Sequence, residues 1–217
     1  MTEPFIRPYN PAADFEACLH IFRTTIDPSL AFEPASTIGS YIWCRPYIHL
    51  SPHTCYVLDN GSGQAVGYII GTETTATFSK RWKSEFVPTV ELKNVPKPGL
   101  DRAQVDLQWM REAVYNGECS TLLPFPELLE EYPAHLHIDI LPAFTGKGWG
   151  GKMVGVFEDR MRELGAEGVH LGMVRTNERA KAFYERLGFE VCGQVLDGGT
   201  SGEVGREGDA VCLVKTL

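Results

Sequence analysis

The stretch from Leu141 to Met153, LPAFTGKGWGGKM, combines four glycines with two lysines in thirteen residues. Glycine lets a backbone turn tightly between a strand and a helix, and no side chain then blocks the approach of a ligand. The free N–H groups at the start of such a helix point at an anion. This stretch therefore predicts a phosphate-binding site.

The spacing of these glycines fits three phosphate-binding templates, and the neighbouring residues separate them. A P-loop needs Ser or Thr after its lysine to hold magnesium, and here that position is Met153. A dinucleotide-binding turn, Gly146-x-Gly148-x-x-Gly151, needs an acid about 20 residues further on. The next predicted strand instead ends at Arg175, which suits a 2′-phosphate and keeps an NADP-dependent oxidoreductase as a remote alternative. The third template is the pyrophosphate loop of an acetyl-CoA-dependent acyltransferase.

Three polar residues alternate with apolar ones just before the glycine stretch. His135, His137 and Asp139 in HLHIDI share one face of the predicted strand. A carboxylate in a partly dry cleft can take a proton from an amine, so Asp139 is the first candidate for a general base and Glu73 is the second. Neighbouring loops that satisfy the polar groups are the structural alternative. Three aromatic residues are candidate walls of an acceptor pocket: Trp82, Trp109 and Tyr132.

The elements that must position these residues follow from periodicity and from turn signals. Strands are expected over 5–10, 54–59, 64–73, 134–141, 168–174, 189–196 and 209–217, and helices over 11–25, 35–50, 148–164 and 177–187. Residues 74–133 read as a variable insertion of helical pieces and loops. The order predicts an α/β fold, with a mixed sheet that has antiparallel pairs at both ends.

Composition limits the classes of function. The 217 residues carry a net charge of −8, which argues against a nucleic-acid surface. No apolar run approaches a membrane span, and no secretory signal pattern opens the chain. Six cysteines lack metal-site spacing, so reduced thiols, no metal and a cytoplasmic or nuclear location are expected. The sequence leaves open whether the protein forms a homodimer.

Two motifs together carry a resemblance to a known family. HIDILPAFTGKGWGGKM, followed after one strand by NERAKAFYERLGFE (177–190), resembles the GNAT superfamily of acetyltransferases. The resemblance covers 54–73 and 134–216 well and the N-terminal helices loosely. It implies a single domain over 1–217, with a mostly antiparallel mixed sheet that splays at its fourth strand and with the 74–133 insertion between the third and fourth strands.

The resemblance also implies a function and a set of site residues. The implied reaction is transfer of acetyl from acetyl-CoA to an amine acceptor, by direct attack in a ternary complex. Tyr184 matches the residue that protonates the departing thiolate of coenzyme A, and Asn177 matches a contact of the pantetheine arm. The edge of the fourth strand from Ile138, splayed open at Pro142, would pair with that arm. The expected cofactor-binding set is Ile140, Leu141, Thr145, Gly146, Lys147, Gly148, Trp149, Gly150, Gly151, Asn177, Phe183 and Tyr184.

One residue departs from the family pattern. Thr145 stands where the family usually has Gln or Arg, so a long polar side chain that would cover the phosphates is missing. An acetyl-CoA-binding pseudoenzyme with little transferase activity is therefore the alternative function. A narrower similarity, in RPYIHLSPHTCYVLD and HLHIDILP, is to stand-alone proteins related to the acetyltransferase-like domain of O-GlcNAc hydrolases. The acceptor is not identified by the sequence.

Overall fold

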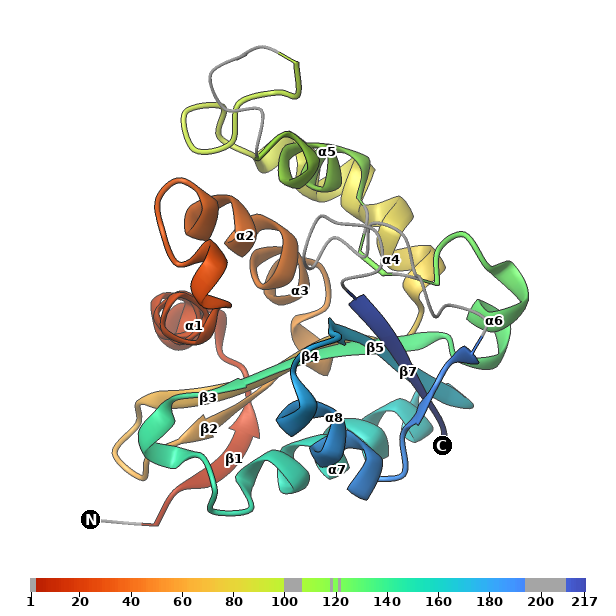
Figure 1. The fold of residues 1–217 in the computed structure, drawn as a ribbon. Coiled ribbons are helices and arrows are strands. Elements are labelled where there is room, and N and C mark those ends of the chain that lie inside the picture. The colour runs from red at the N-terminus through yellow and green to blue at the C-terminus, as the bar shows by residue number, and fades with distance from the viewer. Residues whose placement is uncertain (1–2, 100–106, 118, 121, 194–209) are drawn as a thin grey trace.

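A computed structural model describes residues 3–99, 107–117, 119–120, 122–193 and 210–217. These residues form a sheet of seven strands in the order β1-β2-β3-β4-β5-β7-β6, shown in Figure 1. The strands are β1 Phe5–Pro8, β2 Tyr56–Asp59, β3 Ala65–Thr72, β4 Ala134–Ile140, β5 Gly168–Val174, β6 Glu190–Val191 and β7 Ala210–Thr216. The α-helices are α1 Pro11–Thr25, α2 Ala35–Trp43, α3 Arg45–Leu50, α4 Thr75–Arg81, α5 Gln108–Asn116, α6 Pro126–Glu131, α7 Trp149–Glu163 and α8 Glu178–Arg186.

The helix boundaries follow the local signals in the sequence. The Asn10 side chain accepts a hydrogen bond from the Ala12 N–H at the start of α1, which satisfies one of the unpaired N–H groups there. The expected helix over 35–50 divides into α2 and α3 at Cys44, and Pro46 lies in the first turn of α3. Proline is tolerated in a first turn because its missing N–H would have no helical partner.

The sheet separates two helical layers, as Figure 1 shows. Helices α1 to α5 cover one face, and α7 and α8 cover the other. On the first side Tyr47 stacks on Phe78 at 4.8 Å between ring centroids, and on the second side Phe157 is fully buried. Gly71 of β3 lies close to both β4 and α7, and an added Cβ would lie 2.2 Å from the His135 carbonyl oxygen and 2.6 Å from the Phe157 ring. A side chain at this position would force the sheet and α7 apart.

The pairing of β4 and β5 is the feature that opens a site. These two strands are parallel and pair only at Ala134–Val169 and His135–His170, whereas every other neighbouring pair of described strands is antiparallel. The strands diverge from Leu136 onward. The expected fold class, a mixed and mostly antiparallel sheet splayed at its fourth strand and flanked by helices, is confirmed. The splay begins well before Pro142, so that proline is not its cause.

The same pairing excludes the dinucleotide alternative. A dinucleotide-binding turn belongs to a sheet of mostly parallel strands with helices on both faces. Here a single described strand pair is parallel, and β5 is flanked on its other side by antiparallel β7. The remote alternative, an NADP-dependent oxidoreductase with a dinucleotide-binding turn, therefore does not fit this sheet.

The insertion between β3 and β4 is helical as expected, and it includes α4, α5 and α6. One residue of the insertion that was predicted to line a pocket does not do so. Trp82 is fully buried, and its Nε1–H donates to the Val114 carbonyl at 2.9 Å, so it is a core residue. Trp109 packs on Trp43 in the same layer, and Tyr132 precedes β4 at the end away from the splay.

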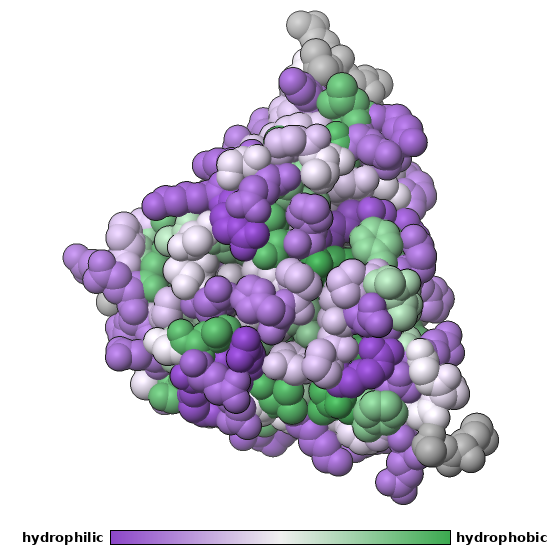
Figure 2. Space-filling model, turned by 180° about the vertical axis from the view of Figure 1, so that it is seen from behind, coloured by the Kyte–Doolittle hydropathy of each residue, from purple (hydrophilic) through white to green (hydrophobic). Residues whose placement is uncertain are grey.

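Some expectations fall outside the described residues. These are residues 100–106, 118 and 121 of the insertion, the end of the strand expected over 189–196, and the Gly-rich segment after it; the described β6 has only two residues. All six cysteines are buried. No described helix is both long and apolar enough to span a bilayer. On the face drawn in Figure 2, hydrophilic residues predominate and apolar residues occur in small groups.

Candidate active site

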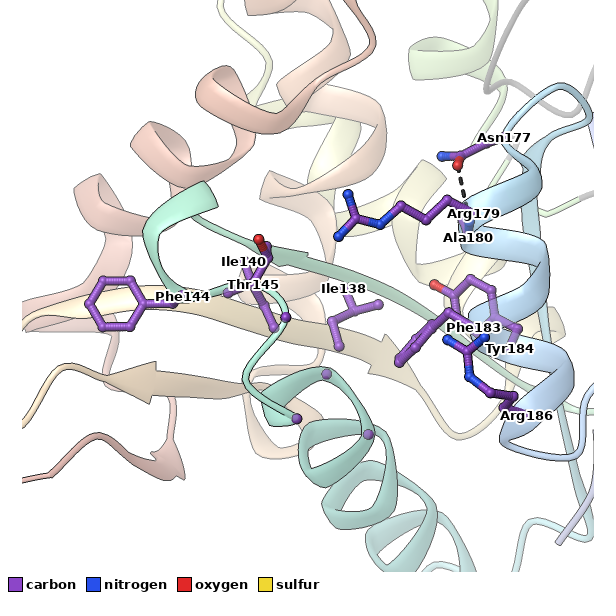
Figure 3. Close-up of a pocket in the computed structure, with 14 residues that line it drawn as sticks. Ile138, Ile140, Phe144, Thr145, Asn177, Arg179, Ala180, Phe183, Tyr184 and Arg186 are labelled. Atoms are coloured by element: carbon purple, nitrogen blue, oxygen red, sulfur yellow. Dashed lines mark hydrogen bonds between the residues drawn. The ribbon is translucent and has the colours of Figure 1, made fainter.

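A cleft of about 500 Å³ opens where β4 and β5 separate. Its walls are the last residues of β4, the turn that enters α7, and one side of α8, as Figure 3 shows. Nine residues of the expected cofactor-binding set line it: Ile140, Thr145, Gly146, Gly148, Gly150, Gly151, Asn177, Phe183 and Tyr184. The glycine stretch and the NERAKAFYERLGF helix therefore meet at one cleft.

The turn after β4 is shaped for an anion. Gly146 and Gly148 have φ values of 73° and 80°, a region that other residues enter only with strain. Within the described part of the chain, the N–H groups from Gly146 to Gly151 have no hydrogen-bond partner. Lys152 is the first residue whose N–H closes a helical turn, on the Gly148 carbonyl. The open N–H groups and the helix dipole together favour negative charge at this point.

Gly150 has a different role from the two turn glycines. A Cβ at Gly150 would lie 3.0 Å from the ring of Phe183, which is closer than ordinary packing permits. The absence of a side chain lets α7 approach α8, and Phe183 thereby fills the floor of the cleft between them. Phe183 thus packs against the core and also lines the cleft.

Helix α8 presents polar groups to the cleft. The Asn177 side chain accepts the Ala180 N–H at 3.0 Å and caps the helix. Tyr184 is 9% exposed, and in Figure 3 its hydroxyl lies on the side of α8 that faces β4. Arg179 and Arg186 also line the cleft, and sequence reasoning missed both. The signal was present, because Arg179, Phe183 and Arg186 lie at i, i+4 and i+7 on one helical face.

Three residues of the expected cofactor set do not line the cleft. Lys147 bends back and donates to the Ala143 carbonyl at 2.7 Å. Trp149 packs against the core, with the Lys152 ammonium 4.4 Å from its ring. The Leu141 N–H is paired with Val66 and continues the β3–β4 ladder. The structure places them beside the cleft.

Asp139 lies on the other face of β4. Ile138 and Ile140 point into the cleft, so Asp139 between them faces the helical layer of α1 to α3. Tyr68 is directly opposite it on β3, and the Tyr68 hydroxyl donates to the Asp139 carboxylate. Burial raises the pKa of Asp139 to about 6, while the Tyr68 hydrogen bond favours the carboxylate and opposes a larger rise. This carboxylate is poised to exchange a proton near neutral pH.

His135 and His137 share the face of Asp139, as the alternation predicts. Both rings hydrogen-bond the Tyr47 hydroxyl, at 2.9 and 3.0 Å. Burial lowers the pKa of His135 well below the ordinary value and that of His137 to about 4, so both rings are neutral. Tyr47 of α3 thus contacts both rings, and Thr75 of α4 lies 2.6 Å from Nδ1 of His135.

Glu73 lies far from this face. Thr72, the residue before it, is opposite His135 in the β3–β4 register, whereas Asp139 is opposite Tyr68. Glu73 therefore lies beyond the end of β3 that is away from the splay, where its Oε2 is 3.6 Å from Nε2 of His53. The structure does not bring Glu73 to the cleft.

The donor groups of the site do not resemble a metal centre. Among the described residues, no three His, Cys, Asp or Glu side chains are grouped so as to hold a metal ion. The polar groups at the cleft are instead amide N–H groups, guanidinium groups and a phenol, which suit an organic phosphate ligand.

Comparison with known proteins agrees with this geometry. A family model described as "Acetyltransferase (GNAT) family" matches residues 16–189. The solved structure of SsHAT is 32% identical, with a TM-score of 0.81 over 99% of this chain and 98% of its own. A Drosophila melanogaster polyamine N-acetyltransferase is 15% identical, with a TM-score of 0.57 over 99% of this chain and 100% of its own. The NatC complex bound to Gag peptide and CoA is 14% identical, with a TM-score of 0.55 over 100% of this chain and 99% of its own. The last two likenesses concern the fold alone.

Proposed function

Because the chain belongs to the acetyltransferase (GNAT) family, we propose that it is an N-acetyltransferase that transfers the acetyl group of acetyl-CoA to an amine in a ternary complex. The observation that carries this proposal is the position of β4. One face of its splayed end lines a cleft with an anion-binding turn, and the opposite face holds a carboxylate of raised pKa. We treat residues 1–217 as one domain and the reaction as independent of metal.

Two features of the cleft support acetyl-CoA as the cosubstrate. The N–H groups from Gly146 to Gly151 would hold the pyrophosphate, and the guanidinium groups of Arg179 and Arg186 would add charge-assisted hydrogen bonds. The edge of β4 from Leu136 onward faces no described strand, so the amide-bearing pantetheine arm can lie along it. Asn177 and Phe183 would border that arm.

The reaction needs two protons removed from nitrogen and one supplied to sulfur. Asp139 takes the first proton from the protonated amine, and the neutral nitrogen then attacks the thioester carbonyl carbon. The C–N bond forms, the C–S bond breaks, and the Tyr184 hydroxyl gives a proton to the departing sulfur; the second proton of the nitrogen restores the Tyr184 hydroxyl, and Asp139 releases its proton to solvent. Asp139 serves as the base because its pKa of about 6 leaves it ionised at neutral pH, yet basic enough to accept a proton.

The narrower relationship is also part of this proposal. RPYIHLSPHTCYVLD, over 45–59, supplies α3, which carries Tyr47, and β2. HLHIDILP supplies the polar face of β4. We propose that the chain is a relative of the acetyltransferase-like domain of O-GlcNAc hydrolases. Its acceptor belongs to one of four amine classes: an amino sugar, a small amine, a peptide N-terminus or a lysine side chain.

One observation favours the second candidate function, a protein that binds acetyl-CoA and transfers little. The Thr145 hydroxyl donates to the Pro142 carbonyl at 2.9 Å and closes its own turn. No long side chain covers the phosphates from this position. Thr145→Arg, with Thr145→Leu as a control of similar bulk without charge, tests this idea. Tighter acetyl-CoA binding in the arginine variant alone would identify Thr145 as the weak point.

Two measurements test the main proposal. Calorimetric titration should show binding of acetyl-CoA and no binding of NADP. Thiol release over a panel of the four amine classes should show turnover that persists with a chelator present and that falls in Asp139→Asn and Tyr184→Phe. Absence of acetyl-CoA binding at millimolar concentration would contradict both candidate functions. Binding without turnover of any acceptor class would leave the second.

A further inference from the structure

A second pocket lies in the helical layer that covers the other face of the sheet. Its volume is about 380 Å³, and its walls are formed by α1, α2, α3 and the insertion segment 86–94. Figure 1 shows α1, α2 and α3 on the side of the sheet away from α7 and α8, which border the cleft. No described residue lines both pockets. The second pocket is therefore a separate site, of a size that is usual for a small-molecule ligand.

Arg45 is the charged group of this pocket that is held most firmly. Its Nε donates to the Ser40 hydroxyl oxygen at 3.0 Å, and that hydroxyl donates in turn to the Thr37 carbonyl at 2.6 Å. The guanidinium carbon lies 4.5 Å from the centre of the Tyr41 ring and 5.4 Å from that of Phe15. Among the described residues, its two Nη groups have no hydrogen-bond or ion-pair partner. A guanidinium fixed at Nε and open at both Nη groups is pre-organised for a planar anion such as a carboxylate.

The hydroxyl of Tyr41 offers a second donor to the same pocket. Nδ2 of Asn94 donates to Oε2 of Glu91 at 2.8 Å and to the Tyr41 hydroxyl oxygen at 3.1 Å. The contact with a carboxylate identifies this atom as the amide nitrogen, because the amide oxygen has no proton to offer. Tyr41 is therefore the acceptor, and its own proton has no acceptor among the described residues. Tyr41 is only 5% exposed, and an acceptor atom on a ligand would satisfy this donor.

The charges around the pocket favour a ligand with one negative charge. Arg45 and the exposed Arg23 contribute two positive charges, and the exposed Glu16 and Glu91 contribute two negative charges. Oε2 of Glu91 is already 3.2 Å from Nζ of Lys93, so one guanidinium group of the pocket has no matching carboxylate. A monoanion fits this balance, whereas a doubly charged phosphate would be repelled more strongly by both carboxylates.

One wall of the pocket is apolar. Leu19 and Phe86 line it and are 2% and 3% exposed. The ring of His49 lies 5.8 Å from that of Phe86 and extends the same wall. A few placed polar groups beside an apolar wall are typical of sites for small organic molecules. A short apolar group attached to the anion would be shielded from water against these side chains.

We propose that this pocket is a second binding site, and that it takes a small organic monocarboxylate with an apolar body. The carboxylate lies on the open Nη groups of Arg45 and accepts the Tyr41 proton, and the body packs on Leu19 and Phe86. Exposed charges such as Arg23 are commonly solvated and alone would carry no ligand site. The proposal depends instead on two donors without acceptors, one fixed and one buried, that line one pocket. It is independent of the transferase function.

Three probes of similar shape test the ligand class by calorimetric titration. Phenylacetate carries the monoanion, phenylacetamide replaces it with a neutral amide, and benzylphosphonate replaces it with a dianion. Phenylacetate should bind about tenfold or more tightly than phenylacetamide, because the amide forms no charge-assisted pair with Arg45. It should also bind more tightly than the doubly charged phosphonate. Equal affinities for the three probes would overturn the proposal, as would no binding of phenylacetate at millimolar concentration.

Two variants test the donors. Arg45→Lys keeps the charge and loses the paired Nη groups, so the Kd for phenylacetate should rise about tenfold. Tyr41→Phe should raise it roughly threefold to tenfold, the worth of one hydrogen bond. Arg81→Lys is the matched control, because the guanidinium of Arg81 is paired with Glu85 and Arg81 lines neither described pocket. A loss in Arg81→Lys equal to that in Arg45→Lys would contradict the site.

A surface variant keeps the test decisive if the two donor variants do not fold. Arg23→Glu reverses an exposed charge at the pocket and should weaken phenylacetate binding by about threefold or more. Lys80→Glu makes the same change in net charge at an exposed position that lines neither described pocket, and it should have little effect. Equal effects of the two reversals would contradict the site.

Competition tests whether the second pocket is separate from the cleft. Saturating coenzyme A should leave the Kd for phenylacetate unchanged, and so should Asp139→Asn. Competition with coenzyme A would place the carboxylate at the arginines of the cleft and overturn this inference while leaving the transferase proposal intact. Phenylacetate binding that depends on Arg45 in a protein without acetyl transfer would count against the transferase proposal alone.

Discussion

Tyr68 and Asp139 face each other directly across the β3–β4 pair, and the Tyr68 hydroxyl donates a hydrogen bond to the Asp139 carboxylate. Two effects on the Asp139 pKa therefore act against each other. Burial favours the neutral acid and raises the pKa to about 6, while the phenol favours the charged carboxylate. Removal of the phenol proton donor weakens the opposition to burial and leaves the Thr25 hydrogen bond as the remaining contact that favours the carboxylate.

This balance predicts the pH dependence of transfer. If Asp139 is the base, kcat/KM should fall as pH drops through about 6, because the protonated acid cannot take the proton of the amine. In Tyr68→Phe the same fall should occur at higher pH. Asp139→Asn should lose about 10²-fold or more in rate and lose this limb of the profile. Asp159→Asn, at an exposed ion pair with Arg162, is the control. If kcat/KM falls at the same pH in Tyr68→Phe as in the unaltered protein, the pKa belongs to another group.

Two turn glycines allow the effect of a substitution on stability to be distinguished from its effect on cosubstrate binding. Gly148→Ala forces a side chain into a φ of 80° and should lower the free energy of unfolding by about 1–2 kcal/mol. Gly63→Ala imposes the same strain at φ 88° in the β2–β3 turn, and in both places the added Cβ meets no atom within 4 Å. Denaturant unfolding should therefore show similar losses. Only Gly148→Ala should raise KM for acetyl-CoA, and equal KM values in both variants would contradict a phosphate site at this turn.

Arg179 and Arg186 predict recognition of the phosphates. Each alanine variant should raise KM for acetyl-CoA about tenfold, in line with the loss of a charge-assisted hydrogen bond. Arg160→Ala, on α7 in an ion pair with Glu163, should have no such effect. The decisive comparison uses acetylpantetheine, which lacks the nucleotide phosphates. All four proteins should turn it over alike, and a defect that persists with this substrate would place the arginines elsewhere in the reaction.

The site was predictable from sequence wherever a residue type was required by the backbone or by periodicity. Gly146 and Gly148 predicted a turn because φ near 75° favours glycine, and alternation predicted that Asp139 shares one face of the strand with His135 and His137. Glu73 was misjudged because strand register is set by pairing between distant segments. The register places Glu73 away from the splay, and no local pattern encodes that.

Other features depend on packing that sequence patterns do not contain. Trp82 looked like a pocket wall, but its N–H finds the Val114 carbonyl inside the helical layer. The Tyr47 hydroxyl joins His135 and His137 across 88 and 90 positions of the chain, a relationship visible only after folding. Such long-range partners are what convert a polar strand face into a defined arrangement of donors and acceptors.

The buried titratable groups predict how stability changes with pH. His135, His137 and His170 have folded-state pKa values below the ordinary 6.5, down to about 4 for the last two, because burial disfavours the charged ring. Between pH 6.5 and 4 the unfolded chain therefore binds protons that the folded protein does not, and stability falls as pH falls. Asp139 acts in the opposite sense, since its folded pKa of about 6 exceeds the ordinary 3.8.

Near pH 5.5 these four groups together take up roughly two protons when the protein unfolds. The free energy of unfolding should therefore fall by roughly 3 kcal/mol for each unit by which the pH drops. Urea unfolding between pH 5 and 7.5 measures this slope. Asp139→Asn removes the opposing group and should steepen the slope by about one proton, whereas the exposed Asp159→Asn should leave it unchanged. An unchanged slope in Asp139→Asn would mean that the carboxyl titrates alike in the folded and unfolded states, and the raised pKa on which its role as base depends would then be wrong.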